Sequence, residues 1–553
     1  MKKLSTKRTL ALLAATVMGV SAFASCGGGG KPDNALGGYS DRANKVSVVY
    51  VANAYGKEWI TAIAKEYMDN YNTDTYIDLK QSVTPTEDFS KVESNTAPAD
   101  LYLFDQDLKT LKGFAEDVQD VWDSYAYGEE NQAGAKKIKD KLVSLWASRV
   151  DHHGIREYSL PYSQATTYGW VYNKTTLDAA FPDGYTLPRT TDELFEFGTS
   201  VKSVDLANVN ESQDVYLLTC SLGDQNENLR YSQNTWLMQI MGKEKYDKFY
   251  DGRYWDEATS SYIFDETKPT AFEKYETELK QFYEIINTLG TPSNGYLHKD
   301  SPSMDYIYAS GALAGAGFKG NKSKVVFKVD APYFESETKM FLDGMKNKGE
   351  EQTMGIMAFP VASAIIDRLD TVNDDATLRQ VIDFVDGKTA TAPAGISEAD
   401  INEVREARGM VGIYTGGGMV IPKTATNKSG AKDFMRFLAS DKAAVVSAQA
   451  MKGLEILPYG KIVSDTELGF TKSNFLQEVS VWMSRNTAMA SSDAPFGVYT
   501  RFGEGEETTQ LIYSIFGGRF DGVDAWYTAK YNYFAGRWSD MVRDYKAEGF
   551  TTD

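Results

Sequence analysis

The sequence predicts an α/β protein built around largely parallel sheets. Residues 45–52, KVSVVYVA, are almost all apolar or β-branched, which is the pattern of a strand covered on both faces. Residues 75–80 and 100–104 predict two further strands. Between the first two strands, apolar residues recur at helical spacing, and these are Trp59, Ile60, Ile63, Ala64, Tyr67 and Tyr71. An alternation of strands and helices is typical of a parallel sheet with helices on its faces.

The rest of the chain predicts a second set of elements. A hairpin turn that enters a strand is expected over 151–161, and further strands are expected over 168–173, 324–329, 354–360 and 416–422. LPRTTDE at 187–193 predicts a helix start, capped by Thr or Asp with acids in its first turn. Residues 205–300 are polar, rich in aromatics and mostly helical. The acidic, helical segment 366–408 is interpreted as an insertion. One face of another helix is formed by Ala431, Phe434, Met435 and Leu438.

The N-terminus predicts an export signal that ends at a cysteine. MKKLSTKR carries four positive charges and precedes the apolar run TLALLAATVMGV, which is shorter than the roughly 20 residues of a membrane-spanning helix. Small residues then lead to Cys26 and four glycines. This arrangement resembles a bacterial lipoprotein signal, although Phe23 stands where that pattern prefers an aliphatic residue. We expect residues 1–25 to be removed, Cys26 to be acylated, and residues 26–44 to form a flexible tether.

The composition indicates a large acidic protein. The chain has 553 residues and a formal net charge of -19, which becomes -23 once the four positive charges of the signal are removed. Such a charge disfavours nucleic acid and anionic lipid surfaces as partners. With Cys26 acylated, Cys220 is the one cysteine left, so no intramolecular disulfide is expected. Aromatic residues make up 13%, which suits a sugar-binding protein without identifying one.

Six segments, in the same order, resemble an extracellular solute-binding protein of a carbohydrate-type ABC transporter, the group that contains maltose-binding protein. VSVVYVANAYGKEWITAIAKEYMDNYNTDTYIDL resembles the family's first strand, its Trp-bearing helix and its second strand, and APADLYLFDQD resembles the strand that ends at the cleft. EYSLPYSQATTYGWVYNKTTL resembles the first crossing between lobes, and LPRTTDELFEF the start of the helix after it. The last two segments are YIYASGALAGAG and GGGMVIPKTATNKSGAKDFMRFLAS.

The resemblance implies a two-lobed, type II periplasmic-binding-protein fold with hinge crossings and a ligand cleft. Lobe I would comprise 45–161 and 417–458, and lobe II 162–416 and 459–553. Closure would be a hinge motion stabilised by ligand. The function that the resemblance implies is that of a monomeric receptor, anchored by lipid at the cell surface or in the periplasm. It would capture a sugar or oligosaccharide and deliver it to ABC permease subunits.

Several motif matches are interpreted as coincidences. Gly315, Gly317 and Gly320 match G-x-G-x-x-G, but a strand is predicted after them, where a dinucleotide site needs a helix. GKT at 387–389 lacks the first glycine of a phosphate loop, so no cofactor is expected. His152 and His153 are adjacent in a turn and do not converge as metal ligands. A G-x-S-x-G elbow for nucleophilic hydrolysis is not present in the sequence.

Candidate ligand-binding residues follow the predicted strands, because open α/β sheets bind ligands at the carboxyl ends of their strands. The polar candidates are Asn53, Tyr55, Asp105, Gln106, Asp107, Tyr162 and Gln164. Sugar rings also stack on aromatic side chains. The aromatic candidates are Trp236, Trp255, Phe318, Tyr414 and Trp482, each of which can equally be a core residue. Gly417, within the run Gly416 to Gly418, is a candidate for close backbone approach or hinge freedom.

Two other functions remain open on the sequence. The same fold could bind a peptide, a polyamine or a metal chelate, with Asp105 and Asp107 as counter-charges to a cation. The chain could also be a surface glycoside hydrolase, which needs two carboxylates about 5–9.5 Å apart across one bond. With 77 acidic residues some pair always satisfies that spacing, so the abundance of acids is no argument for catalysis. The order of the six segments favours binding without chemistry.

Overall fold

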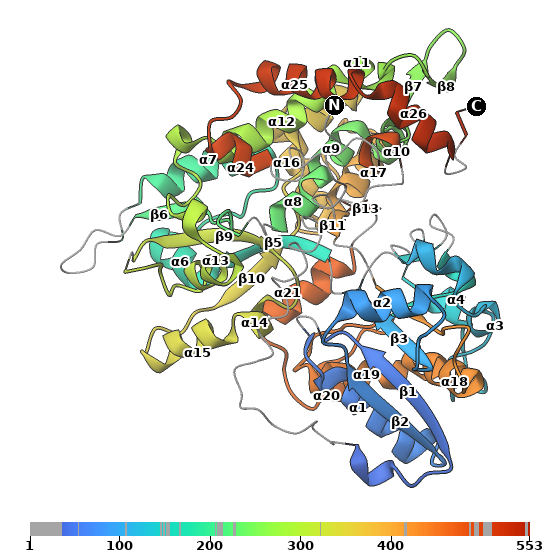
Figure 1. Ribbon diagram of the computed structural model, residues 1–553. Coiled ribbons are helices and arrows are strands. Elements are labelled where there is room, and N and C mark those ends of the chain that lie inside the picture. Colours follow the sequence, from blue (N-terminus) through green and yellow to red (C-terminus); the bar gives the residue numbers. More distant parts are fainter. Residues whose placement is uncertain are drawn as a thin grey trace, which may run out of the picture. The chain divides into compact units, whose positions relative to one another are not determined.

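The computed structural model describes residues 36–52, 55–105, 108–143, 146–147, 150, 155–164, 167–204, 206, 214–224, 228–320, 322–413, 417–485, 488–491, 497–501, 511–547 and 551–552. The chain divides into two compact units (Figure 1). Unit 1 comprises Met1–Ala165 and Thr415–Ser473, and unit 2 comprises Thr166–Tyr414 and Asn474–Asp553. The chain therefore crosses between the units three times. The third crossing, at Ser473, comes later than the position near 458 expected from the sequence.

Unit 1 contains a five-stranded sheet in the order β2-β1-β3-β12-β4. Its strands are β1 (Asn44–Tyr50), β2 (Thr75–Gln81), β3 (Leu101–Phe104), β4 (Leu160–Pro161) and β12 (Gly418–Val420). The three strands predicted first, β1, β2 and β3, pair in parallel as expected. The later strand β12 runs antiparallel to both β3 and β4. All four residues of β3 are buried, which explains its continuous apolar sequence.

Helices cover the sheet of unit 1. In α1 (Glu58–Glu66) the predicted apolar face is buried, and the helix continues into a π-helical turn, η4 (Tyr67–Tyr71). The predicted face of α18 (Lys428–Leu438) is buried as well. The expected hairpin near 151–161 is not formed by its described part, where η6 (Ile155–Glu157) is a 3₁₀ turn before β4. The other helical segments are η2 (Gly37–Tyr39), α2 (Pro85–Glu93), η5 (Lys109–Gly113), α3 (Gln119–Trp122), α4 (Ile138–Lys141), α19 (Asp441–Ala450) and α20 (Asp465–Leu468).

The last part of the expected tether is structured. Leu36 is buried, and the guanidinium of Arg42 donates hydrogen bonds to the carbonyl oxygens of Met68 at 2.7 Å and Thr75 at 3.0 Å. The first strand already begins at Asn44. Residues 36–44 are therefore part of unit 1 rather than a flexible linker. Cys26 and the export signal lie outside the described residues.

Unit 2 contains a mixed sheet in the order β13-β11-β5-β9-β6, with β10 also paired to β5. Its strands are β5 (Thr167–Asn173), β6 (Val215–Leu218), β9 (Lys324–Asp330), β10 (Met354–Met357), β11 (Met410–Ile413) and β13 (Ala488–Ser491). The central strand β5 is buried along its whole length and runs antiparallel to β9, β10 and β11. The sequence predicted β5, β9 and β10 but missed β6, β11 and β13.

Helices make up most of the rest of unit 2, as the sequence predicted for 205–300. Before β9 they are α6 (Lys174–Ala180), α7 (Thr191–Lys202), α8 (Asn228–Ser232), α9 (Asn234–Met241), α10 (Lys243–Tyr250), α11 (Thr270–Lys274), α12 (Glu276–Gly290), η7 (Pro292–Asn294), η8 (Ser301–Ser303) and α13 (Tyr306–Leu313). After β9 they are α14 (Phe334–Glu337), α15 (Lys339–Asn347), η9 (Ser363–Arg368), α16 (Asp375–Val385), α17 (Glu398–Arg408), α21 (Asn474–Met483), α22 (Val498–Arg501), α24 (Leu511–Phe516), α25 (Val523–Ala535) and α26 (Trp538–Ala547). A hairpin of β7 (Arg253–Asp256) and β8 (Ser261–Phe264) interrupts them.

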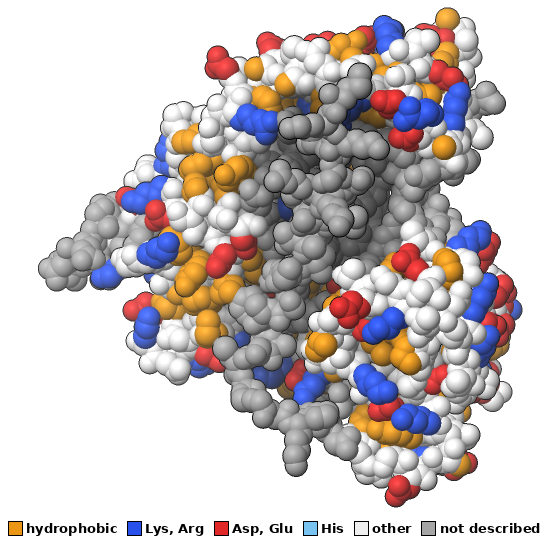
Figure 2. Space-filling model, viewed as in Figure 1, with side chains coloured by type: hydrophobic (Ala, Val, Ile, Leu, Met, Phe, Trp, Pro, Cys, Tyr) orange, Lys and Arg blue, Asp and Glu red, His pale blue; other side chains and the backbone are white. Residues whose placement is uncertain are grey.

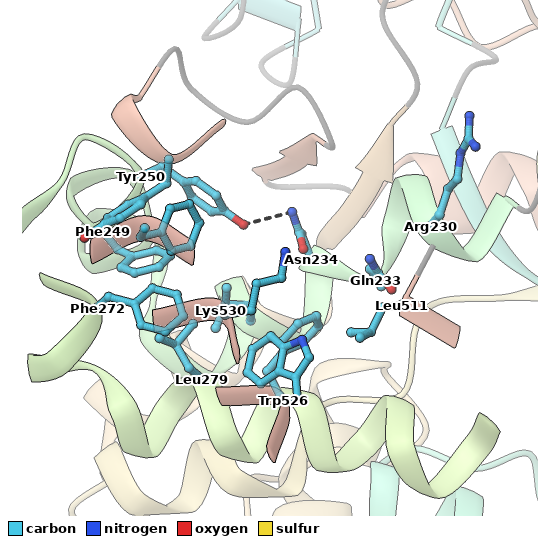
Figure 3. Close-up of a pocket in the computed structure, with 14 residues that line it drawn as sticks. Arg230, Gln233, Asn234, Phe249, Tyr250, Phe272, Leu279, Leu511, Trp526 and Lys530 are labelled. Carbon is cyan, nitrogen blue, oxygen red and sulfur yellow. Dashed lines mark hydrogen bonds between the residues drawn. The ribbon is translucent and has the colours of Figure 1, made fainter. Parts of the chain in front are cut away.

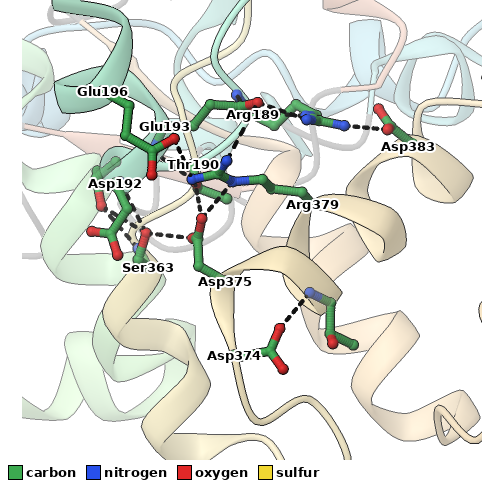
Figure 4. A network of polar contacts seen from close by, with 12 residues as sticks. Arg189, Thr190, Asp192, Glu193, Glu196, Ser363, Asp374, Asp375, Arg379 and Asp383 are labelled. Atoms are coloured by element: carbon green, nitrogen blue, oxygen red, sulfur yellow. Dashed lines mark hydrogen bonds and ion pairs between the residues drawn. The ribbon is translucent and has the colours of Figure 1, made fainter. Parts of the chain in front are cut away.

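The segment interpreted as an insertion is helical and has a small core of its own. The helices α16 and α17 bury Leu378, Val381 and Val404 in a cluster separate from the main core of unit 2. A polar network fastens α16 to the start of α7 (Figure 4). Arg189 forms ion pairs with Glu193 on α7 and Asp383 on α16.

The cap of α7 lies beside this network and has the predicted form. The side chain of Thr190 accepts a hydrogen bond from the backbone N–H of Glu193, so Thr190 is the cap that the sequence left open between Thr and Asp. The hydroxyl of Thr190 also lies 3.1 Å from a carboxylate oxygen of Asp375, the first residue of α16. Thr190 therefore accepts a hydrogen bond from a backbone N–H at the start of α7 and also helps to position the insertion.

The surface carries both signs of charge. On the face drawn in Figure 2, acidic and basic side chains are interspersed rather than gathered in one patch. Many of them form ion pairs at exposed positions, such as Lys174 with Asp178 and Lys339 with Asp343. Within the described part of the chain, no helix is both long and apolar enough to cross a membrane.

Candidate functional site

One edge of the unit 1 sheet is the edge at which the chain crosses to unit 2. Gly418, at the start of β12, pairs with Phe104 at the end of β3 and with Pro161 at the end of β4. The chain leaves unit 1 shortly after Pro161 and returns to it shortly before Gly418. We call this side the crossing edge of unit 1. Residues that follow β3 and β4 therefore lie where the crossings begin and end.

Three of the sequence-predicted residues, Tyr55, Asp105 and Tyr162, come together at this edge. Tyr162 and Tyr55 are both buried, and the hydroxyl of Ser163 lies 3.0 Å from that of Tyr55. Burial raises the pKa of Tyr162 well above its usual value, and the electrostatic effects of Asp105 and Tyr55 act in the same direction. The hydroxyl of Tyr162 therefore stays protonated. The ring of Tyr162 stacks on that of Trp59 with a centroid separation of 5.8 Å. This packing fixes the tyrosine at the end of β4.

The other predicted residues of unit 1 have varied placements. The backbone N–H of Gln164 donates a hydrogen bond to the carbonyl oxygen of Ile456 at 2.7 Å. This bond joins the start of the first crossing to the segment that precedes the third crossing. Gly417 directly precedes β12 and packs against the backbone of Phe104 and Asp105. Asn53, Gln106 and Asp107 lie outside the described residues.

Unit 2 has a corresponding crossing edge. Its central strand β5 begins at Thr167, directly after the first crossing, and β11 ends at Ile413, directly before the second. Thr167 pairs with Ile413, and Gly169 pairs with Asp330, the last residue of β9. The carboxyl end of β9 therefore lies at the edge of the sheet where the chain enters and leaves unit 2. We call this side the crossing edge of unit 2.

A buried ion pair lies at the end of β9. The ammonium of Lys328 and the carboxylate of Asp330 are 2.6 Å apart, and both side chains are fully buried. The other oxygen of Asp330 accepts hydrogen bonds from the backbone N–H of Ala331 at 2.8 Å and from the amide of Asn228 on α8 at 3.1 Å. A buried charge is stable only when it is paired and hydrogen-bonded in this way.

Tyr306 and Glu337 complete this group, which we call the β9-end cluster: Asn228, Tyr306, Lys328, Asp330 and Glu337. The hydroxyl of Tyr306, on α13, lies 3.0 Å from Asp330 and 2.5 Å from the carboxylate of Glu337, on α14. Glu337 is exposed as a whole residue, but its carboxylate is turned onto Tyr306. Loss of hydration, followed by the charge of Asp330, raises the pKa of Glu337 to about 7.

The β9-end cluster was missed from the sequence. The strand over 324–329 was predicted, and the rule that selected Asp105, a polar residue directly after a buried strand, applies equally to Asp330. That signal could have identified the aspartate. Tyr306, Glu337 and Asn228 carry no local signal, because their positions beside Asp330 depend on how three helices pack against the sheet.

The aromatic candidates in unit 2 are mostly core residues. Trp236 is fully buried, contacts Trp170 and Phe359, and donates its indole N–H to the carbonyl oxygen of Pro360 at 3.0 Å. Phe318 is buried against the ring of Tyr308. These two side chains are packed inside the unit instead of forming a stacking surface.

The remaining aromatic candidates differ in exposure. Trp482 is buried on α21. Trp255 is 40% exposed on the β7–β8 hairpin, where its ring contacts Tyr262 edge to face. Tyr414 lies outside the described residues. Of the aromatic candidates that the structure describes, Trp255 therefore has the most accessible ring.

A pocket also lies within the helical part of unit 2 (Figure 3). Its walls are largely aromatic and include Phe249, Phe272 and Trp526. Two of its polar groups bond to each other, since the amide of Asn234 donates to the hydroxyl of Tyr250 at 3.0 Å, and Figure 3 shows Arg230 extending away from the rings. None of the sequence-predicted residues lines this pocket. Its chemistry suits apolar groups better than a polyhydroxylated ligand.

The chain thus forms two α/β units joined by three crossings, which is the two-lobed architecture expected from the sequence. The family described as "Bacterial extracellular solute-binding protein" matches residues 53–219. This match confirms, over that part of the chain, the resemblance seen in the sequence. No curated protein sequence matches the chain.

Solved structures agree on the fold. The chain is similar to the apo form of RafE from Streptococcus pneumoniae, with a TM-score of 0.54 and 13% identity over 90% of this chain and 99% of RafE. It is similar to RafE in complex with raffinose, with a TM-score of 0.50 and 12% identity over 90% and 100%. An ABC transporter solute-binding protein from Thermotoga lettingae bound with α-D-tagatose gives a TM-score of 0.50 and 13% identity over 90% and 100%. The predicted two-lobed fold is thereby confirmed.

Proposed function

We propose that this protein is the substrate-binding component of an ABC importer and that it captures a sugar or oligosaccharide for delivery to a permease. The observation that carries the proposal is the match of residues 53–219 to the bacterial extracellular solute-binding family. The fold supports it, because proteins of similar structure are bound to raffinose and to α-D-tagatose. In this proposal the ligand is released unaltered, and the protein acts at the cell surface or in the periplasm.

We propose further that the two crossing edges supply the ligand contacts. Sugar hydroxyls both donate and accept hydrogen bonds, so carboxylates, amides and phenols are suitable partners for them. The crossing edge of unit 1 offers Asp105, and that of unit 2 offers Tyr306 and Glu337 of the β9-end cluster. Gln106, Asp107 and Asn53 remain candidates from the sequence. Trp255 remains a candidate for ring stacking because it is accessible.

A thermal-shift screen tests this function. The mature protein is heated with a panel of mono- and oligosaccharides, and we expect a few of them to raise its unfolding temperature. A ligand present at 100 times its Kd stabilises the folded state by about 2.7 kcal/mol. Reducing ends are assayed in the same samples and should not increase with time. Steady release of reducing ends would show that the protein is a glycosidase instead of a receptor. A panel in which no sugar raises the unfolding temperature would contradict sugar binding.

The carboxylates at the two crossing edges also support a cationic ligand as a second candidate. Asp105 lies at one edge, and Asp330 and Glu337 lie at the other, with Lys328 as the nearby counter-charge. Binding of a polyamine would weaken as salt rises, whereas binding of a neutral sugar would be nearly insensitive to salt. Titrations at two salt concentrations therefore distinguish the two ligand classes.

We also propose that Cys26 anchors the protein through acyl chains. The supporting observation is the sequence order of basic residues, apolar run, small residues and cysteine. Expression in a bacterial host with a clickable fatty acid should label the wild-type protein and leave Cys26→Ser unlabelled. The variant should also leave the membrane fraction. A Cys220→Ser variant is the matched control and should be labelled as strongly as the wild type, since Cys220 is buried.

A further inference from the structure

The hydroxyl of Tyr306 lies between two carboxyl groups but has only one hydrogen to donate. Its oxygen is 3.0 Å from Oδ1 of Asp330 and 2.5 Å from Oε2 of Glu337. Ionised carboxylates only accept hydrogen bonds, whereas a protonated carboxyl group also donates one. If both acids were ionised, one of these two contacts would bring together oxygens with no hydrogen between them. A single additional proton satisfies both contacts.

The surroundings decide which acid holds that proton. Asp330 already receives hydrogen bonds from Lys328, Ala331 and Asn228, which favour its ionised form. Glu337 receives one contact in the described structure, from Tyr306. The charge of Asp330 opposes ionisation of Glu337, while the more distant charge of Lys328 favours it. The proton therefore belongs on Glu337.

Charged groups on the neighbouring elements also face Tyr306 and Glu337. On β9 these groups are Lys328 and Asp330. On α13 the group is Tyr306, whose ring centroid lies 4.2 Å from the ammonium of Lys328. The backbone N–H of Tyr306 donates to Asp224 at 3.1 Å. Tyr333 directly precedes α14, and Glu335 lies on α14. The electrostatic effect of Tyr333 contributes to raising the pKa of Tyr306, after burial and the charges of Asp330 and Glu337. Lys328 is the one cation that acts on Glu337 among these groups, and it is already paired with Asp330.

We propose that Glu337 carries a proton at mildly acidic pH and donates it to Tyr306, which in turn donates to Asp330, so that the β9-end cluster is a proton-responsive switch at the crossing edge of unit 2. When Glu337 loses its proton, its carboxylate takes the hydrogen of Tyr306, and Asp330 loses one of its donors. The charged groups Lys328, Asp330 and Glu337 then change from a net charge of zero to one negative charge.

This charge change has a consequence for the ligand, which rests on the proposed function. A neutral cluster suits an uncharged ligand such as a sugar, because covering it removes no unpaired charge from water. A singly negative cluster favours a cation instead. Proton loss at Glu337 would therefore shift the preference of this edge from neutral toward cationic ligands as the pH rises above about 7.

Stability as a function of pH tests the switch without any ligand. A folded-state pKa of about 7, above the ordinary value of 4.5, makes the folded state hold a proton that the unfolded state has lost. The folded-to-unfolded ratio of the wild type should then fall, relative to that of Glu337→Gln, between pH 4.5 and 7, and the fall is at most about tenfold per pH unit because Glu337 is exposed and water screens its charge. Above pH 7 the difference should become constant. Glu257→Gln, at an exposed turn, is the matched control and should give no such slope.

Infrared spectroscopy gives a second, independent readout. At pH 6 the carbonyl band of protonated carboxylic acids should be stronger in the wild type and in Glu257→Gln than in Glu337→Gln, where the remaining band comes from other acids such as Asp251, whose burial raises its pKa to about 6. If Glu337→Gln does not fold, Tyr306→Phe serves instead, since it should retain the band but shift it through loss of the hydrogen bond. A pH-independent stability difference, or bands of equal strength in the wild type and Glu337→Gln, would show that Glu337 is ionised and overturn the proposal. A negative sugar screen would leave both of these measurements intact.

Discussion

The carbonyl oxygen of Phe104 occupies the space into which any side chain at Gly417 would project. A Cβ atom at Gly417 would lie 1.7 Å from this oxygen and 2.7 Å from the Cα of Asp105. The contact joins the end of β3 to the segment that re-enters unit 1 before β12. Glycine is therefore required here by close backbone approach, which was one of the two roles that the sequence suggested for it.

We predict that Gly417→Ala destabilises unit 1. The methyl group cannot be accommodated without moving the backbone of β3 or β12, and overpacking of this kind typically costs about 1–3 kcal/mol or more. Urea unfolding should show the loss as a lower midpoint. The matched control is Gly113→Ala, also in unit 1, where a Cβ would meet nothing within 4 Å. Equal midpoints for the two variants would contradict the importance of this contact.

A second prediction concerns Asp100, which joins three segments of unit 1. Its carboxylate accepts hydrogen bonds from the backbone N–H groups of Ser47, Thr426 and Asn427, each at 2.9 Å. Burial alone would raise the pKa of Asp100, but these hydrogen bonds outweigh it and hold the pKa below the usual value. Asp100→Asn places an N–H where an acceptor is needed, and we expect a loss of about 2–3 kcal/mol at neutral pH.

The pH dependence of this loss provides its check. A lowered folded-state pKa contributes stability that is present above the unfolded-state value of about 3.8 and is lost as the pH falls through the folded-state value. The advantage of the wild type over Asp100→Asn should therefore shrink below about pH 4. Denaturant titrations at pH 7 and pH 3 measure it. An advantage that is unchanged at pH 3 would mean that the charge of Asp100 is irrelevant.

Local sequence patterns predicted the elements whose environment is uniform along their length. Strand β5 is buried on both faces, so its apolar run was recognisable, and the face of α18 was recognisable from its spacing. Strand β6 was missed because its four residues lie within a long polar and aromatic region. Its pairing partner β9 is more than 100 residues away in the sequence, and no local pattern encodes that pairing.

The candidate site was only partly predictable for a similar reason. The rule of polar residues after buried strands led to Asp105 and, had it been applied to β9, would have led to Asp330. It could not reveal that Tyr306 lies beside Asp330, because that neighbourhood depends on the packing of α13. Aromatic residues were harder still. Trp236 and Trp255 have equally apolar rings, but one is fully buried and the other is 40% exposed.

A third prediction addresses the attachment of the insertion to α7. The guanidinium of Arg189 is mostly buried and pairs with both Glu193 and Asp383. Arg189→Ala should leave these carboxylates without their main partner and cost about 1–3 kcal/mol, with faster hydrogen exchange in α16. Lys388→Ala is the matched control, since Lys388 pairs with the same Asp383 but is 52% exposed. Exposed ion pairs contribute about 0–1 kcal/mol, so α16 should keep its protection in this variant.

The last prediction separates the two charges of the buried pair in unit 2. Lys328→Met leaves the carboxylate of Asp330 buried without its cation, and breaking a fully buried pair in this way typically costs about 3–5 kcal/mol. Asp330→Asn alone leaves the ammonium of Lys328 without its anion and should be similarly costly. The double variant buries neither charge, so it should be more stable than either single variant, with a favourable coupling that urea unfolding of all four proteins can measure. Additive losses would show that the two groups act independently, and their 2.6 Å contact would then contribute little to the stability of the sheet edge.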